Sequence, residues 1–252
     1  MDVDTNQPLG TPTWIDLGVP DLDRALAFYG ALFGWEFDIG PEEYGRYTMC
    51  LLRGRRAAAI AAQAALSSTV FWNVYLATHD CDDTAERARQ AGAELLMEPT
   101  DVMDDGRMAI VRDPVGAQFG LWQGRAHPGA GVVNEPGALV RNDLVTPEPG
   151  PAREFYAAVF DFTLEGNPDM PAADFTFLRR PDGHEVGGIM GAPGGTSAWS
   201  TTFEVAGTDE AVRRALDNGG SSDGAKDFLY GRLATITDPF GAVFSIITRP
   251  ES

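Results

Sequence analysis

Apolar residues alternate with other residues over positions 14–19 and then recur at helical spacing over positions 22–32. The period of two predicts a half-buried strand, and the longer spacing predicts an amphipathic helix. Asp21 lies between the two segments, where its carboxylate can cap the helix N-terminus. A second strand and helix run from Trp72 to a glycine stop at Gly92, with Asp80 or Asp82 as the cap.

The chain contains an internal repeat. Residues 27–35 (AFYGALFGW) recur as residues 154–162 (EFYAAVFDF) at an offset of 155 − 28 = 127, and Trp72 recurs as Trp199 at the same offset. Asp-Pro-x-Gly turns at 113–116 and 238–241 are also repeated. Each copy holds a fainter repeat of a strand, a helix and several further strands. We therefore predict two duplicated domains built from four βαβββ units.

The expected domain boundaries lie in sequence rich in Gly and Pro. We expect an N-terminal tail at 1–9, a first domain at 10–123, a linker at 124–136, a second domain at 137–248 and a tail at 249–252. The segment Asn134-Glu135-Pro136-Gly137 is typical of a tight turn before a strand. Each domain is long enough to bury a core of its own.

Composition narrows the class of protein and of partner. Hydrophobic residues make up 44% and charged residues 22%, which is typical of a globular protein that neither is disordered nor spans a membrane. The formal charge of −18 repels phosphate backbones and anionic lipids, so neither nucleic acid nor a membrane is an expected partner. Two cysteines form no disulfide framework and the first residues lack a secretory signal, so a cytoplasmic location is expected.

These landmarks resemble the vicinal oxygen chelate superfamily of glyoxalases, bleomycin-resistance proteins and extradiol dioxygenases. The resemblance rests on residues 19–29 (VPDLDRALAFY), on residues 32–35 (LFGW) and on the two Asp-Pro-x-Gly turns, and it covers most of both domains. The linker and length look most like two-domain actinobacterial members labelled glyoxalase or hydroxylase. The resemblance implies an α+β fold of tandem domains, in which two βαβββ units form a curved mixed sheet around a cup with helices outside.

Metal-dependent members of that family hold a divalent cation in the cup. Carried over by the resemblance, the ligand positions fall near residues 59–61 and 188–190 and at Trp14, Asn73, Gly120, Arg141, Ser200 and Ser245. No imidazole or carboxylate stands at any of them, and a divalent cation needs several such groups. We therefore expect no resident metal, unless an ion is held unconventionally. His79, His127 and His184 lie in turns or in the linker and are expected to be solvated or to cap a turn.

Strand alternation divides the sheet residues into two faces. The face toward the helices is expected to carry Ile15, Leu17, Val74, Leu76, Phe119, Leu121, Leu144, Phe203, Phe244 and Ile246. The first cup is expected to carry Trp14, Asp16, Asn73, Tyr75, Gln118, Gly120 and Trp122. The second cup is expected to carry Arg141, Asp143, Ser200, Thr202, Glu204, Val243, Ser245 and Ile247.

The cup residues combine aromatic surface with polar groups, as small-molecule pockets do. Asp16, Asp143 and Glu204 are candidate catalytic residues, and the candidate ligand-binding residues are Trp14, Asn73, Tyr75, Gln118, Trp122, Arg141, Ser200, Thr202 and Ser245. Five of them have a structural alternative: Trp14 and Trp122 could fill the core, Asp16 and Asp143 could be hydrogen-bonded, and Arg141 could pair with Asp143. Arg141 could instead form a fork for a carboxylate or phosphate.

Two functions remain open at this point. The missing metal ligands favour a binding protein, monomeric or homodimeric, that holds a small, partly aromatic molecule in a metal-free cup. The family resemblance favours an enzyme, such as a glyoxalase-like lyase or a hydroxylase- or dioxygenase-like catalyst, that uses the cup carboxylates or an unconventionally held metal. Nothing in the sequence favours a third function, that of a protein–protein interaction module.

Overall fold

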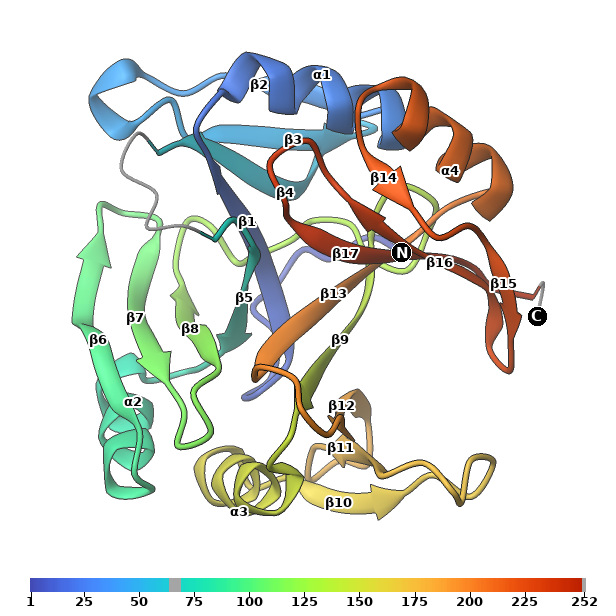
Figure 1. The fold of residues 1–252 in the computed structure, drawn as a ribbon. Helices are drawn as coiled ribbons and strands as arrows, with labels where there is room; N and C mark the ends of the chain where they lie inside the picture. The colour runs from blue at the N-terminus through green and yellow to red at the C-terminus, as the bar shows by residue number, and fades with distance from the viewer. Residues whose placement is uncertain (64–68, 251–252) are drawn as a thin grey trace.

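The computed structural model describes residues 1–63 and 69–250, which form two mixed β-sheets with α-helices at their margins (Figure 1). A strand, a helix and a group of further strands follow one another four times along the chain. The predicted α+β architecture of tandem domains built from βαβββ units is therefore confirmed.

The first sheet has the strand order β2-β3-β4-β1-β5-β8-β7-β6. Its central strand β1 runs parallel to β4 and antiparallel to β5, so the two βαβββ units meet along their first strands. The strands are β1 (Pro12–Val19), β2 (Glu36–Asp38), β3 (Thr48–Leu52), β4 (Arg55–Ala62), β5 (Trp72–Ala77), β6 (Glu94–Val102), β7 (Gly106–Arg112) and β8 (Gln118–Gly124). A short 3₁₀ helix (Glu42–Tyr44) precedes β3.

The second sheet repeats this arrangement in the order β10-β11-β12-β9-β13-β17-β16-β14, and β15 pairs with β16. Strand β9 runs parallel to β12 and antiparallel to β13, as β1 does with its neighbours. The strands are β9 (Leu139–Thr146), β10 (Thr163–Gly166), β11 (Phe175–Arg179), β12 (Glu185–Gly191), β13 (Ala198–Glu204), β14 (Ser221–Ser222), β15 (Lys226–Phe228), β16 (Gly231–Thr237) and β17 (Val243–Thr248).

Helices α1 (Leu22–Phe33) and α2 (Cys81–Gln90) begin where the sequence predicts. The second domain has α3 (Pro149–Phe160) and α4 (Thr208–Asp217). The carboxylates of Asp21 and Asp80 accept the backbone N–H groups of Arg24 and Asp83, which confirms both N-caps. In Figure 1, α1 lies beside α4 at the top and α2 lies near α3 at the bottom, so each helix pair joins the two domains. No helix of the described residues is both long and apolar enough to cross a membrane.

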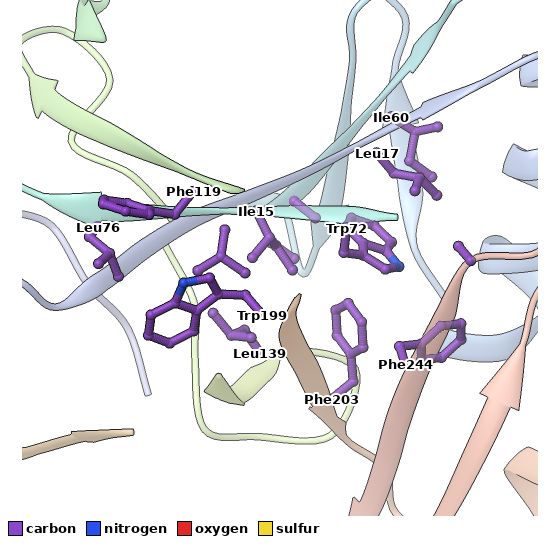
Figure 2. Packing of buried hydrophobic residues seen from close by; sticks show 14 of the residues in the cluster. Ile15, Leu17, Ile60, Trp72, Leu76, Phe119, Leu139, Trp199, Phe203 and Phe244 are labelled. Carbon is purple, nitrogen blue, oxygen red and sulfur yellow. The ribbon is translucent and has the colours of Figure 1, made fainter. Parts of the chain in front are cut away.

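One hydrophobic core lies between the two sheets and joins both domains. Figure 2 shows Trp72 of β5 beside Phe203 of β13. The two rings pack edge-on with their centroids 5.4 Å apart. Phe33 of α1 contacts the same phenylalanine at 4.7 Å. Every residue predicted for the face toward the helices is buried in this core. The predicted division of the strands into two faces is therefore confirmed for the core side.

The linker is not a free connection between the sheets. Its residues Gly131–Val133 pair with the N-terminal residues Met1–Val3 through backbone hydrogen bonds and an isolated bridge. The predicted turn follows, with Asn134 and Gly137 both in the left-handed region, at φ values of 58° and 88°. The N-terminal tail is therefore paired with the linker, and the linker is joined to β9 by the bond from the backbone N–H of Asn134 to the carbonyl of Leu139.

Candidate functional site

The first cup has a polar centre built around the carboxylate of Asp16. Tyr47 and Tyr75 donate their hydroxyl groups to its Oδ2 atom, each at 3.0 Å, and Asn73 donates its side-chain amide to Oδ1 at 2.8 Å. Asp16 and its pair partner Asn73 lie on neighbouring strands, which places both side chains on the same face of the sheet. The cup therefore converges on one acid group rather than on a set of metal ligands.

Two further bonds extend this network outward. The indole N–H of Trp14 donates to the Tyr47 hydroxyl at 2.9 Å, and Gln118 donates to the Oδ1 atom of Asn73 at 3.3 Å. Burial raises the pKa of Asp16, while its bonds from Asn73, Tyr75 and Tyr47 oppose that rise. Burial beside the same carboxylate also raises the pKa of both tyrosines, so the phenols remain neutral donors.

Aromatic and thioether side chains surround the polar centre. Trp14, Tyr75 and Trp122 form a second, smaller hydrophobic cluster on the cup side of the sheet, and its partly buried members include Tyr47, Met49, Val102, Met108, Ile110 and Val133. These side chains give the first cup both apolar walls and hydrogen-bonding groups, the mixture that small-molecule pockets share.

The position of His127 decides between the two alternatives expected for it. The linker histidine is not solvated, because only 4% of its surface is exposed, but its Nδ1 atom accepts the backbone N–H of Gly129 at 3.3 Å, as the capping alternative predicts. Its ring packs edge-on against Trp14, with centroids 4.4 Å apart, and lies near Trp122. Burial lowers the pKa of His127 to about 4, so it is neutral near pH 7. The linker thus fills the space beside both tryptophans, whereas His79 and His184 are exposed, as predicted.

The second cup is charged where the first is aromatic. The Nε atom of Arg141 lies 2.7 Å from the carboxylate of Asp143, and its Nη1 atom lies 2.5 Å from that of Glu185. The rings of Phe175 and Phe177 lie 5.6 and 5.7 Å from the guanidinium carbon. Burial raises the pKa of Asp143, although Arg141 opposes that rise. The ion pair considered for Arg141 and Asp143 is present, with Glu185 as a third member.

The other residues predicted for the second cup occupy less enclosed positions. Ser200 pairs with Asp143, and Thr202 pairs with both Arg141 and Ser245, so the three hydroxyl residues lie on the same face as the ion pair and are half-buried. Glu204 lies farther along β13 and forms an ion pair with Arg249. The structure therefore brings Arg141 and Asp143 together with the hydroxyl residues and gives Glu204 a different partner.

The residues at the positions that correspond to the metal ligands of the family do not fit a metal ion. A side chain at Gly120 has no room, because a Cβ atom there would lie 2.1 Å from the ring of Tyr75. At Gly188 of the second cup, a Cβ atom would lie 2.2 Å from the ring of Phe175. Within residues 1–63 and 69–250, no three His, Cys, Asp or Glu side chains form a group suited to a metal ion. Aromatic rings and a guanidinium group occupy the space that ligands would need.

Sequence reasoning missed four side chains that complete the two cups. Tyr47 and Phe175 occupy equivalent positions in the two domains. Each directly precedes a residue that pairs with the neighbouring strand in the same way: Thr48 pairs with Ile60, and Thr176 pairs with Ile189. Phe177 and Glu185 belong to strands β11 and β12, for which no face was assigned. An alignment of the two copies through their third strands would have shown an aromatic residue at the same position of both.

Comparison with known proteins points to one family. A model of the Glyoxalase/Bleomycin resistance protein/Dioxygenase superfamily matches residues 11–121. A Mycobacterium tuberculosis protein named "Putative glyoxylase CFP32" is 37% identical, with 94% of each chain covered. The anthracycline biosynthesis protein DnrV of Streptomyces peucetius is 35% identical, with 96% of this chain and 94% of that protein covered.

Solved structures of this type share the fold. The Mn(II)-bound glyoxalase from Novosphingobium aromaticivorans has a TM-score of 0.69 at 17% identity, covering 97% of this chain and 83% of that chain. The 2,3-dioxygenase LapB from Pseudomonas sp. KL28 has a TM-score of 0.67 at 15% identity, covering 97% of this chain and 96% of that chain. At these identities the similarity concerns the fold alone.

Proposed function

The chain belongs to the Glyoxalase/Bleomycin resistance protein/Dioxygenase superfamily, and from this premise we propose that its first cup binds a small, partly aromatic molecule without a resident metal ion. The observation that carries the proposal is the network at the cup centre, where Asp16 accepts hydrogen bonds from Tyr47, Tyr75 and Asn73. In metal-dependent relatives several ligands converge on a cation, whereas here several neutral donors converge on one acid group.

The first cup suits a planar molecule with a polar edge. Tyr47, Met49, Met108 and Ile110 are partly buried, so they offer apolar surface that a ring system can cover. Thioether side chains are unbranched and polarizable, so they adapt to the shape of a flat aromatic ligand and make favourable contacts with its ring. An ionised carboxylate has about four acceptor sites, so Asp16 can accept a ligand hydroxyl beside its three present donors.

Two relatives support an aromatic ligand. DnrV and the protein DauV of a Streptomyces species, which is 33% identical over 96% of this chain, are both named for anthracycline biosynthesis. Anthracyclines are planar, polycyclic aromatic molecules that carry hydroxyl and carbonyl groups. A ligand of that chemistry would combine ring contacts with a hydrogen bond to the Asp16 network.

The test combines metal analysis with ligand binding. Elemental analysis of the purified protein is expected to show no stoichiometric divalent metal. A dihydroxyanthraquinone probe is expected to quench tryptophan fluorescence, since Trp14 and Trp122 lie in the first cup. Asp16→Asn should weaken binding by about tenfold or more, in line with about 1.5 kcal/mol or more for a hydrogen bond to a charged group. Asp143→Asn, the equivalent change in the second cup, is the matched control and should bind like the wild type.

Three outcomes would overturn the proposal: stoichiometric metal held by cup side chains, no binding of the probe, or equal loss of binding in both variants. Equal loss would mean that the probe does not distinguish the first cup from the second.

A second candidate function is acid–base catalysis at Asp16. It is favoured by the raised pKa of this carboxyl group, because a carboxyl with a raised pKa is a better proton acceptor when ionised. One relative is named as a glyoxylase, so the reaction to test is isomerisation of the hemithioacetal that methylglyoxal forms with glutathione or mycothiol. Turnover that Asp16→Asn abolishes and Asp143→Asn retains would favour this function over binding alone.

A further inference from the structure

The linker completes the first sheet at a place where two strands separate. At the N-terminal ends of β1 and β4, the backbone N–H of Ala130 donates to the carbonyl of Thr13, and that of Gly131 donates to the carbonyl of Arg56, each at 2.7 Å. The Nε atom of Arg55 then donates to the carbonyl of Gly131, also at 2.7 Å. Two main-chain hydrogen bonds and one bond from the Arg55 side chain therefore hold an extended linker segment between the two strands.

The second sheet has the same opening. The register pairs Asp16 with Ala59 in the first sheet and Asp143 with Gly188 in the second, so the offsets are 143 − 16 = 127 for β9 and 188 − 59 = 129 for β12. The equivalents of Thr13, Arg56 and Arg55 are accordingly Val140, Glu185 and His184. A ladder irregularity occurs at the equivalent place in both sheets, which explains why the strands part at the same point.

A cavity of about 280 Å³ lies at this opening, and Val140, Glu185 and His184 all line it. Its volume is close to the lower end of small-ligand pockets, ~300 Å³. Within residues 1–63 and 69–250, no loop or linker N–H donates to the carbonyl oxygen of Val140 or Glu185. Among the described residues, the linker segment that fills the first opening therefore has no counterpart in the second.

A buried polar side chain marks the same cavity independently. Asn142 also lines it, and only 1% of its surface is exposed. Its amide nitrogen donates to Thr201 Oγ1 at 3.0 Å, but its Oδ1 atom has no hydrogen-bond partner in the described part of the chain. Asn142 and Thr201 correspond to Ile15 and Val74 in the first domain, which are both apolar. A buried carbonyl without a partner is costly, so this polar side chain distinguishes the second opening from the first.

We propose that the opening between β9 and β12 is a docking slot for an extended peptide segment of a partner protein, with small residues at its centre. Backbone N–H groups of the peptide would donate to the carbonyls of Val140 and Glu185, as Ala130 and Gly131 do in the first domain. The imidazole of His184 would donate to a peptide carbonyl in place of Arg55. Main-chain pairing with a strand edge is an established mode of peptide recognition, and the linker shows that the fold accepts it.

The probe for this slot is the protein's own linker sequence. A capped peptide of residues 129–134 (GAGVVN) is titrated into the full chain by calorimetry, beside a peptide N-methylated at the positions of Ala130 and Gly131. We expect saturable binding of the first peptide, with a dissociation constant below ~1 mM, and at least tenfold weaker binding of the N-methylated peptide. No binding to the folded protein, or equal binding of both peptides, would overturn the proposal.

Variants locate the binding. Val140→Trp should fill the cavity and abolish binding, whereas Val243→Trp, which places the same side chain at a 57% exposed position on β17, should leave binding unchanged. His184→Ala changes an exposed side chain and should weaken binding several-fold with the melting temperature retained. Binding that survives both slot variants would overturn the assignment. Asp16→Asn should not affect the peptide, so this proposal and the one for the first cup can fail separately.

Discussion

The carboxylate of Asp16 illustrates how a neutral hydrogen-bond network differs from a charged one. Three uncharged groups, from Tyr47, Tyr75 and Asn73, donate to it. Neutral donors stabilise the ionised form less than a cation does, and burial disfavours it, so the net effect is a raised pKa. The acid group of the first cup is therefore easier to protonate than an ordinary aspartate.

This shift predicts how stability depends on pH. Between the ordinary pKa of 3.8 and the raised value, the folded protein binds more protons at Asp16 than the unfolded chain does. Its contribution to the free energy of unfolding is therefore greatest at low pH and falls as pH rises through this window, by about 1.4 kcal/mol per unit of pKa shift. Burial also raises the pKa of Asp143, Asp113 and Asp238, which remain in the variant. Asp16→Asn removes only the contribution of Asp16, so urea unfolding across the window should show a smaller fall in the variant than in the wild type. The same pH dependence in both proteins would contradict the assignment.

Packing at Gly120 gives a second prediction for a single residue. Gly120→Ala should destabilise the protein by about 1–3 kcal/mol, because the new methyl group would overlap the Tyr75 ring in a packed cluster. Gly150→Ala is the matched control, since no atom of the described residues lies within 4 Å of the added Cβ atom. Denaturant unfolding of both variants checks the prediction, which fails if the two changes cost the same.

At this scale, strand alternation was enough to place Asp16 and Asn73 on one face, because that face depends only on the period of the strand. Strand alternation could not predict that Tyr47 belongs to the cup, because this residue lies immediately before β3 and outside any alternating run. It also could not predict that His127 is buried, because a linker without periodicity carries no signal of what it packs against.

Helix termini show a difference between otherwise similar elements. Helix α1 has a side-chain N-cap in Asp21, whereas Glu148 at the same position of α3 makes no capping hydrogen bond. Asp21→Ala should therefore lower the free energy of unfolding by about 1 kcal/mol, since it leaves a backbone N–H of the first turn unpaired. Glu148→Ala should change it little. Thermal or urea unfolding of the two variants measures both values, and equal losses would show that the cap bond contributes nothing.

The elements were largely predictable from the sequence, while their main-chain partners were not. Helical spacing and the repeat gave the four βαβββ units because side-chain patterns encode them. The insertion of Ala130 and Gly131 between β1 and β4 uses only backbone groups, which every residue carries. Such contacts leave no pattern in the residue types, so the linker could be recognised as Gly-rich but not as part of the first sheet.

The repeated motifs of the sequence meet at the junction of the two domains. Tyr29 of the first copy donates its hydroxyl to Asp238 in the Asp-Pro-x-Gly turn of the second, at 2.9 Å. Tyr156 of the second copy donates to Asp113 in the turn of the first, also at 2.9 Å. Each aspartate also accepts backbone N–H groups of its own turn. The Phe-Tyr and Asp-Pro-x-Gly motifs therefore form two reciprocal contacts that fix one domain against the other.

This arrangement predicts cooperative unfolding of the whole molecule. The hydrophobic core is continuous from one sheet to the other, so neither domain can unfold without exposing the apolar surface of its partner. Calorimetry should show one transition with equal calorimetric and van't Hoff enthalpies. Tyr29→Phe and Tyr156→Phe should each destabilise the protein by about 1–3 kcal/mol, because each leaves a buried carboxylate without one hydrogen bond.

The double variant distinguishes one cooperative unit from two linked domains. If the packed core couples the domains, its single transition moves to lower temperature, because both tyrosine rings still fill their places beside Trp72 and Phe119. If the two hydroxyl contacts were the main connection, their loss would split the transition into two. Resolved transitions in the wild type, or a split in the double variant, would contradict a shared core as the link between the two domains.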